Sequence, residues 1–295
     1  MSRAVVLVMT IAAVLVGILL ASQDHDVDVV LCAMLLFGLT LAHASNNLIN
    51  DWVDYRQGID TENYFRRRYG VHVLEDNLVT TKEFWWVTSL TGISAIACGI
   101  YVVTQTGLVS LYLAVAGAFF VLFYTWPLKH LALGELSVLL VWGPLITGGS
   151  YYVIAGTMSI EVILISIISG IGPTLVILGK HMDKYADDDE KGISSLPVVI
   201  GLTASRNLTI VLLLIQWLLT CLLVLVSSAW WLLACLLTLP AAVSLFRNLR
   251  AEAPVSKPAG YPDDVWPLWY AAFAFRYCGF FGITMIAGLV FNRLF

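Results

Sequence analysis

Long apolar runs, each ended by a short polar stretch, dominate the pattern of the chain. A helix needs about 20 apolar residues to cross a bilayer, and the strict alternation of a membrane barrel strand is absent. We therefore predict an all-α, polytopic membrane protein with about nine transmembrane helices around a central cavity. The predicted spans are 4–22, 28–49, 84–104, 107–126, 132–154, 160–182, 206–227, 229–246 and 268–292.

The polar stretches are too short for a separate soluble domain. The longest of them are 55–83, 183–205 and 247–266, so we predict one integral membrane domain over residues 1–295. Composition agrees, because 59% of the residues are hydrophobic and 12% are charged, against about a quarter charged in soluble domains. The net charge of −4 offers no basic face for nucleic acid.

Basic residues predict the orientation. If the N-terminus is cytoplasmic, fourteen of the sixteen Lys and Arg residues fall in the chain segments on the inner side. Arg276 lies within the last span and Arg293 lies outside. Cytoplasmic loops of membrane proteins carry such an excess of positive charge. We expect an inner N-terminus, an outer C-terminus and, for the compartment, the plasma membrane.

Two acidic clusters follow apolar spans. The first cluster is the polar part of 46–60, and the second is 183–190. Carboxylates are costly near a bilayer and usually mark a functional site. The clusters end the second and sixth spans, so the four spans between them restore the orientation. We predict two parallel four-helix units plus a ninth helix, with both clusters facing one cavity at the interface of the units.

Helical spacing tests which polar side chains share a face. At about 100° per residue, the first cluster covers an arc of about 140° that holds Asn46, Asn47, Asn50, Asp51 and Asp54. The same rotation places Asp183, Asp187 and Glu190 within about 60° of one another. Asp188 and Asp189 fall off that face, and we expect them to be solvated.

Facing carboxylates repel unless cations lie between them. Carboxylate and amide oxygens suit Mg²⁺, which keeps several waters and binds substrate phosphates. Arg66, Arg67 and Lys129 are placed on the same side and could meet phosphate charge. These features indicate a ligand with a diphosphate head and a lipid tail. The competing interpretation is that each acid simply starts a loop, and that the arginines contact anionic lipid.

Several motifs resemble the UbiA superfamily of intramembrane prenyltransferases. The run from Asn50-Asp51-Trp52-Val53-Asp54 to Gly58-Ile59-Asp60 is similar to its first aspartate motif, and is nearest to the menaquinone-type (dihydroxynaphthoate) branch. Asp183-Lys184-Tyr185-Ala186-Asp187 with Gly192 resembles the second motif. Tyr124-Thr125-Trp126-Pro127-Leu128-Lys129 also falls in the expected order.

The resemblance implies a mechanism. Two Mg²⁺ ions would hold the diphosphate of an isoprenyl substrate, the allylic bond would ionise, and the cation would alkylate an aromatic, quinone-precursor-like acceptor inside the membrane. The expected catalytic residues are Asp54, Asp183 and Asp187. The expected metal ligands are Asn50, Asp51, Asp54, Asp60, Asp183 and Asp187. The expected substrate-binding residues are Asn50, Arg66, Arg67, Tyr124, Lys129, Lys180 and Lys191.

Two alternatives remain open at this stage. The segment 68–74 lacks the Gly-Pro-Leu of the menaquinone-type branch, and Ile193-Ser194 replaces the usual basic residue and Thr after Gly192. With the many aromatic residues, these departures allow a terpene cyclase that uses no acceptor. A cation-coupled transporter would explain the acids but not their spacing. No general base is evident, because His181 is rotated about 160° away from the side of Asp183.

Overall fold

The computed structural model describes residues 4–56, 73–227 and 229–294, and the described part is helical. Its helices are α1 (Ala4–Ala21), α2 (Val29–Arg56), α3 (Thr81–Thr106), α4 (Leu108–Phe123), η2 (Leu128–Leu131), α5 (Gly134–Leu140), η3 (Val141–Gly148), α6 (Gly149–Ala155), α7 (Ile160–Asp183), α8 (Tyr185–Glu190), α9 (Leu196–Ile200), α10 (Leu202–Ser227), η4 (Trp230–Thr238), α11 (Leu239–Arg250) and α12 (Tyr270–Leu294). The predicted all-α class is confirmed.

Seven helices of the described chain are long and apolar enough to cross a membrane. Two of them are composite, because α5, η3 and α6 form one span and η4 with α11 forms another. The predicted first and fourth spans correspond to the shorter apolar helices Val6–Ala21 and Leu108–Phe123. The 16 residues of α4 rise only about 24 Å, less than the roughly 30 Å hydrocarbon core. The count of nine is therefore not confirmed.

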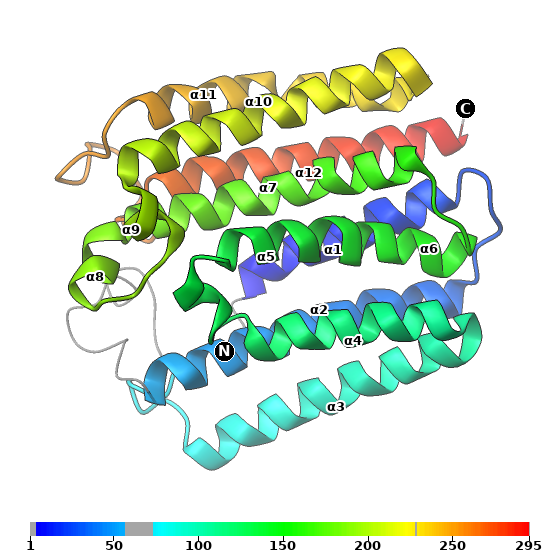
Figure 1. Ribbon diagram of the computed structural model, residues 1–295, viewed down its shortest axis with the longest axis horizontal. Helices are drawn as coiled ribbons and strands as arrows, with labels where there is room; N and C mark the ends of the chain where they lie inside the picture. Colours follow the sequence, from blue (N-terminus) through cyan, green and yellow to red (C-terminus); the bar gives the residue numbers. More distant parts are fainter. Residues whose placement is uncertain (1–3, 57–72, 228, 295) are drawn as a thin grey trace.

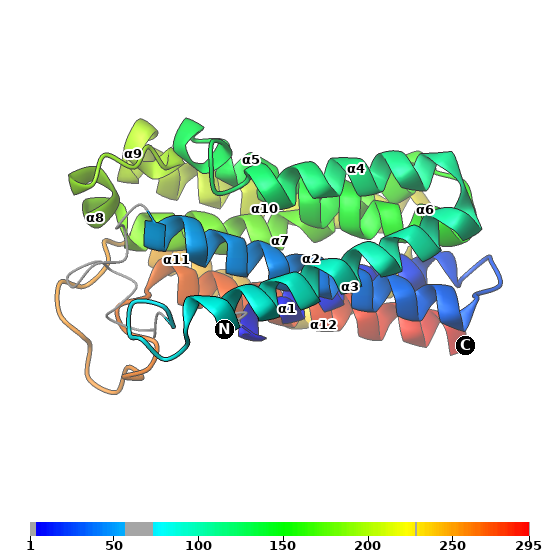
Figure 2. The same ribbon diagram turned by 90° about the horizontal axis from the view of Figure 1, so that it is seen from below.

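The long helices run side by side along the molecule (Figures 1 and 2). In Figure 1, α10 and α11 form one edge, α3 forms the opposite edge, and α7 lies beside α12 between them. The short helices α8 and α9 gather at one end, where α2 and α7 also end. Outward positions on α3 and α10 carry exposed apolar side chains such as Ile93 and Leu218, as expected for a lipid-facing surface.

Small residues allow the central helices to approach closely. A Cβ added at Gly179 of α7 would lie 2.7 Å from the backbone nitrogen of Ala271 on α12. A Cβ at Gly170 would lie 2.8 Å from the nitrogen of Gly143 in η3. Close backbone packing through small residues is typical of helix contacts in membranes. These contacts hold α7 firmly between α12 and the η3 segment, and its C-terminal end enters the polar end of the molecule.

Candidate functional site

A cavity of about 790 Å³ is lined by residues between Val6 and Lys184. Its walls come from α1 to α7, and none of the described residues of α10, η4, α11 or α12 lines it. Residues of both predicted four-helix units therefore line the cavity: all four spans of the first unit, and the fifth and sixth spans of the second unit. The hydropathy pattern predicts the number of spans, but it does not predict which spans pack around the cavity.

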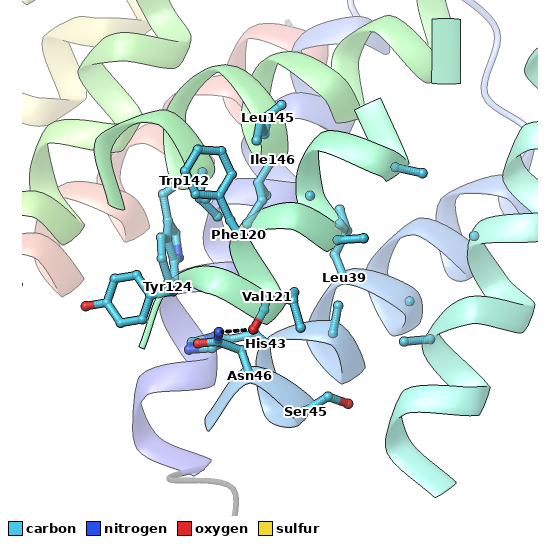
Figure 3. Close-up of a pocket in the computed structure, with 18 of the residues that line it drawn as sticks. Leu39, His43, Ser45, Asn46, Phe120, Val121, Tyr124, Trp142, Leu145 and Ile146 are labelled. Atoms are coloured by element: carbon cyan, nitrogen blue, oxygen red, sulfur yellow. Dashed lines mark hydrogen bonds between the residues drawn. The ribbon is translucent and has the colours of Figure 1, made fainter. Parts of the chain in front are cut away.

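Most of the wall is apolar. Phe120, Trp142, Leu145 and Ile146 project into the same space from α4 and from the α5–η3 segment (Figure 3). Rings and branched side chains of this kind provide a dry surface for a hydrocarbon ligand.

The cavity is open on the flank between α3 and α4. Ile96 and Ile100 of α3, and Val115 and Leu122 of α4, line the cavity and are nevertheless 57–64% exposed. A Cβ added at Gly117 would meet no atom within 4 Å. This flank therefore leaves room for a ligand to pass from the cavity to the apolar exterior.

The first acidic cluster lies at the polar end of the cavity. Asn50 Nδ2 donates to Asp54 Oδ2 at 3.1 Å, and Thr125 Oγ1 donates to Asn50 Oδ1 at 3.2 Å. Lys129 Nζ lies 3.5 Å from Asp54 Oδ1. All four residues are buried, and Asn50, Asp54, Lys129 and Tyr124 line the cavity. The structure thus brings Asn50 and Asp54 of the first aspartate motif together with Tyr124, Thr125 and Lys129 at this end.

The second acidic cluster does not form one continuous helical face. Helix α7 ends at Asp183, Lys184 has non-helical dihedrals (φ −106°, ψ 18°), and α8 restarts at Tyr185. A constant rotation of 100° per residue therefore fails between 183 and 190. The predicted shared face of Asp183, Asp187 and Glu190 rested on that rotation.

Asp183 is turned toward α12. Its carboxylate accepts hydrogen bonds from the backbone nitrogens of Trp269, Tyr270 and Ala271 at 3.0, 2.8 and 2.9 Å. These N–H groups begin α12 and have no acceptor within their own helix. Asp183 therefore caps α12, and neither Asp183 nor Asp187 lines the cavity.

Lys184 takes the inward position instead, with Asp188 behind it. Lys184 lines the cavity, and its Nζ donates to Asp188 Oδ1 at 2.9 Å. Asp188 is 0% exposed, so the expectation that it is solvated was wrong. The break after α7 gives α8 a new direction, and this change carries Asp188 inward.

The two acidic clusters meet as two ion pairs, Asp54 with Lys129 and Asp188 with Lys184. The charges of all four residues act on His130, whose pKa is lowered mainly by burial and next by Lys129. Burial also lowers the pKa of Lys184, the charge of Lys129 lowers it further, and Asp188 opposes both effects. The predicted repulsion between carboxylates is therefore relieved in part by lysines of the chain itself.

Two further α7 residues, Lys180 and His181, line the same end. His181 Nδ1 lies 2.6 Å from Glu135 Oε1, and both side chains are buried. Helical spacing in the sequence placed His181 and Asp183 on opposite sides of the same helix. Because Asp183 faces α12, the opposite side of α7 is the side that faces the cavity.

The remaining predicted site residues have different positions. Asp51 is buried but does not line the cavity, and Lys191 is exposed. Asp60, Arg66 and Arg67 lie outside the described residues.

The described residues provide part of the expected metal site. The described residues contain no group of three or more His, Cys, Asp or Glu side chains that could hold a metal ion. Asn50 and Asp54 offer amide and carboxylate oxygens, a donor set that suits a hard divalent cation completed by water and phosphate. At the second cluster, Asp183 is occupied by backbone N–H groups and Asp188 by an ammonium. The described residues at this end of the cavity fit one such cation better than two.

Comparison with known proteins places this chain in a family. The chain is 28% identical over 217 residues to UbiA prenyltransferase domain-containing protein 1 of Gallus gallus, covering 71% of this chain and 63% of that protein. It is 30% identical over 234 residues to the Mus musculus protein of the same name, covering 76% and 68%. The chain thus spans about two thirds of the length of these relatives.

A solved structure shares the fold. It is a UbiA homologue from Archaeoglobus fulgidus bound to GPP and Mg²⁺, with a TM-score of 0.65 at 14% identity, covering 97% of this chain and 98% of that one. Residues 9–261 match the UbiA prenyltransferase family. This chain, an integral membrane protein whose cavity has its charged residues at one end, belongs to the UbiA prenyltransferase family.

Proposed function

We propose that the protein ionises an isoprenyl diphosphate with the help of Mg²⁺ and transfers the prenyl group to an aromatic acceptor within the membrane. The observation that carries this proposal is one cavity that joins an apolar body to a polar end containing Asn50, Asp54 and three lysines, Lys129, Lys180 and Lys184. A diphosphate fits the polar end, and a hydrocarbon chain fits the apolar body.

Residues of this chain would hold the leaving group. Asn50 and Asp54 would bind Mg²⁺, which would supply charge neutralisation for the departing diphosphate. Lys129, already 3.5 Å from Asp54, and Lys180 would contact phosphate oxygens directly. When the allylic C–O bond breaks, the diphosphate would keep the electron pair, and the ammonium groups of Lys129 and Lys180 would stabilise the charge that develops on it.

The apolar body would hold the prenyl chain and exclude water. The open flank between α3 and α4 gives a long chain room to extend toward lipid. Phe120, Tyr124 and Trp142 line the cavity, and ring faces stabilise a carbocation by cation–π attraction. The cation would then form a C–C bond with an electron-rich ring carbon of the acceptor, and that ring carbon would lose its proton to the released diphosphate.

The acceptor is the finer part of the proposal. The similar relatives are named UbiA prenyltransferase domain-containing protein 1, and the comparisons do not support the closer resemblance to the menaquinone-type branch. The aromatic rings in the wall favour one second candidate, a terpene cyclase in which a distal alkene of the same substrate attacks the cation. We also propose a plasma-membrane location with the polar end of the cavity on the cytoplasmic side.

One experiment separates these functions. Purified protein is incubated with Mg²⁺ and a series of isoprenyl diphosphates, with and without a hydroxybenzoate or dihydroxynaphthoate acceptor. Pyrophosphate release that depends on the acceptor supports transfer, whereas release with a cyclic product and no acceptor supports the cyclase. Asp54→Asn should abolish release, and the exposed control Asp189→Asn should retain it. If no diphosphate is ionised by the unmodified protein, the enzymatic proposal fails.

A further inference from the structure

The polar end of the cavity has an unequal pair of acidic clusters. Asp54 of the first cluster lines the cavity beside Asn50, and its amide and carboxylate oxygens can share a cation. In the second cluster, the inward position belongs to Lys184, while the carboxylate behind it, Asp188, has no exposed surface. A ligand in the cavity would therefore meet the Asp54 carboxylate paired with Lys129 on one side, and the ammonium of Lys184 on the other.

Lys184 is held in place from behind. Its Nζ donates to Asp188 Oδ1 at 2.9 Å. Lys184 immediately precedes α8, and Asp188 lies four positions later at the end of the first turn of that helix. A buried ammonium is costly unless a carboxylate compensates it, so Asp188 keeps the charged end of Lys184 in the wall. The arrangement presents a fixed positive charge to the cavity without a metal ion.

A metal ion at the second cluster would meet two obstacles. Asp183 is directed into the backbone N–H groups that start α12, and turning it inward would leave those groups without their acceptor. A divalent ion beside Asp188 would also stand next to the ammonium of Lys184, which lies 2.9 Å from Asp188 Oδ1, and Lys129 lines the same end of the cavity. Like charges at this separation oppose one another.

We propose that Lys184 replaces the second metal ion, so that the diphosphate binds to one divalent cation at Asn50 and Asp54 and to the ammonium of Lys184. This inference rests on the proposed function, because it requires a diphosphate ligand. It changes the chemistry of the site in one respect: part of the charge that stabilises the leaving diphosphate is covalently built into the chain.

Metal counting tests the proposal without any turnover. Purified protein in detergent is titrated with Mn²⁺ in the presence of a geranyl thiolodiphosphate, a substrate analogue whose allylic bond ionises very slowly, and bound Mn²⁺ is counted by electron paramagnetic resonance. We expect one Mn²⁺ per chain. Two Mn²⁺ ions per chain in the unmodified protein would overturn the proposal, and this measurement needs no variant.

Analogue affinity tests the role of Lys184 itself. Lys184→Gln should weaken binding of the thiolodiphosphate by about 10- to 100-fold, the range for a lost charge-assisted hydrogen bond, and should still bind one Mn²⁺. The matched control is Lys82→Gln, which removes an exposed lysine at the start of α3 and should leave affinity unchanged. Unchanged affinity in a folded Lys184→Gln protein would overturn the proposal.

The two proposals fail in different ways. If the unmodified protein does not bind the thiolodiphosphate at any Mn²⁺ concentration, the diphosphate ligand of the proposed function is wrong, and the inference falls with it. If the analogue binds with two Mn²⁺ ions, the proposed function stands and only the role of Lys184 is rejected.

Discussion

Asp183 gives the sharpest test of the difference between a metal ligand and a helix cap. In the structure its two carboxylate oxygens accept three backbone N–H bonds at the start of α12, with Oδ2 accepting from Trp269 and Ala271 and Oδ1 accepting from Tyr270. The substitution Asp183→Asn keeps the size of the side chain. It replaces one acceptor oxygen with an NH₂ group, which has no lone pair to offer.

The magnitude follows from these contacts. The amide oxygen can keep at most the two bonds now made by Oδ2, so at least one bond to a charged acceptor is lost, worth about 1.5–3 kcal/mol. Loss of the negative charge near a helix N-terminus removes about 0.3–1 kcal/mol more. We expect Asp183→Asn to lower the free energy of unfolding by about 2–4 kcal/mol.

The assay is chemical denaturation in detergent micelles followed by circular dichroism, paired with Mn²⁺ binding on the folded protein. Asp189→Asn is the matched control, because it removes one carboxylate of the same cluster from an exposed position. We expect the control to change stability by less than about 0.5 kcal/mol. If Asp183→Asn leaves the free energy of unfolding unchanged but removes Mn²⁺ binding, the cap is refuted and Asp183 is a metal ligand.

Three further predictions concern packing and helix capping. Gly117→Phe on the open flank should reduce turnover of the longest isoprenyl diphosphates relative to the shortest by about tenfold. Product analysis across chain lengths measures this ratio, and an equal loss of turnover at every chain length would contradict the prediction. Gly179→Ala should lower the free energy of unfolding by about 1–3 kcal/mol, whereas Gly99→Ala, whose Cβ meets no atom within 4 Å, should not. Thr80→Ala should lower it by about 1 kcal/mol, because Thr80 and Glu83 form a capping box at α3; an unchanged denaturation curve would show that this cap contributes nothing.

The sequence by itself determined the class of the protein and one half of the site. Apolar runs of membrane-spanning length are a local property, so the all-α membrane fold follows from them. The first cluster was also predictable, because α2 continues without a break from Val29 to Arg56. Along an unbroken helix, helical spacing does place Asn50 and Asp54 on one face.

Only the tertiary structure decided the second half of the site. The short break at Lys184 ends α7 and turns α8, and no composition or periodicity in 183–190 marks it. The N–H groups at the start of α12, nearly ninety positions along the chain, then draw Asp183 away from the cavity. A local pattern lists which residues carry charge, but which charge faces the ligand depends on the partners that distant segments bring to it.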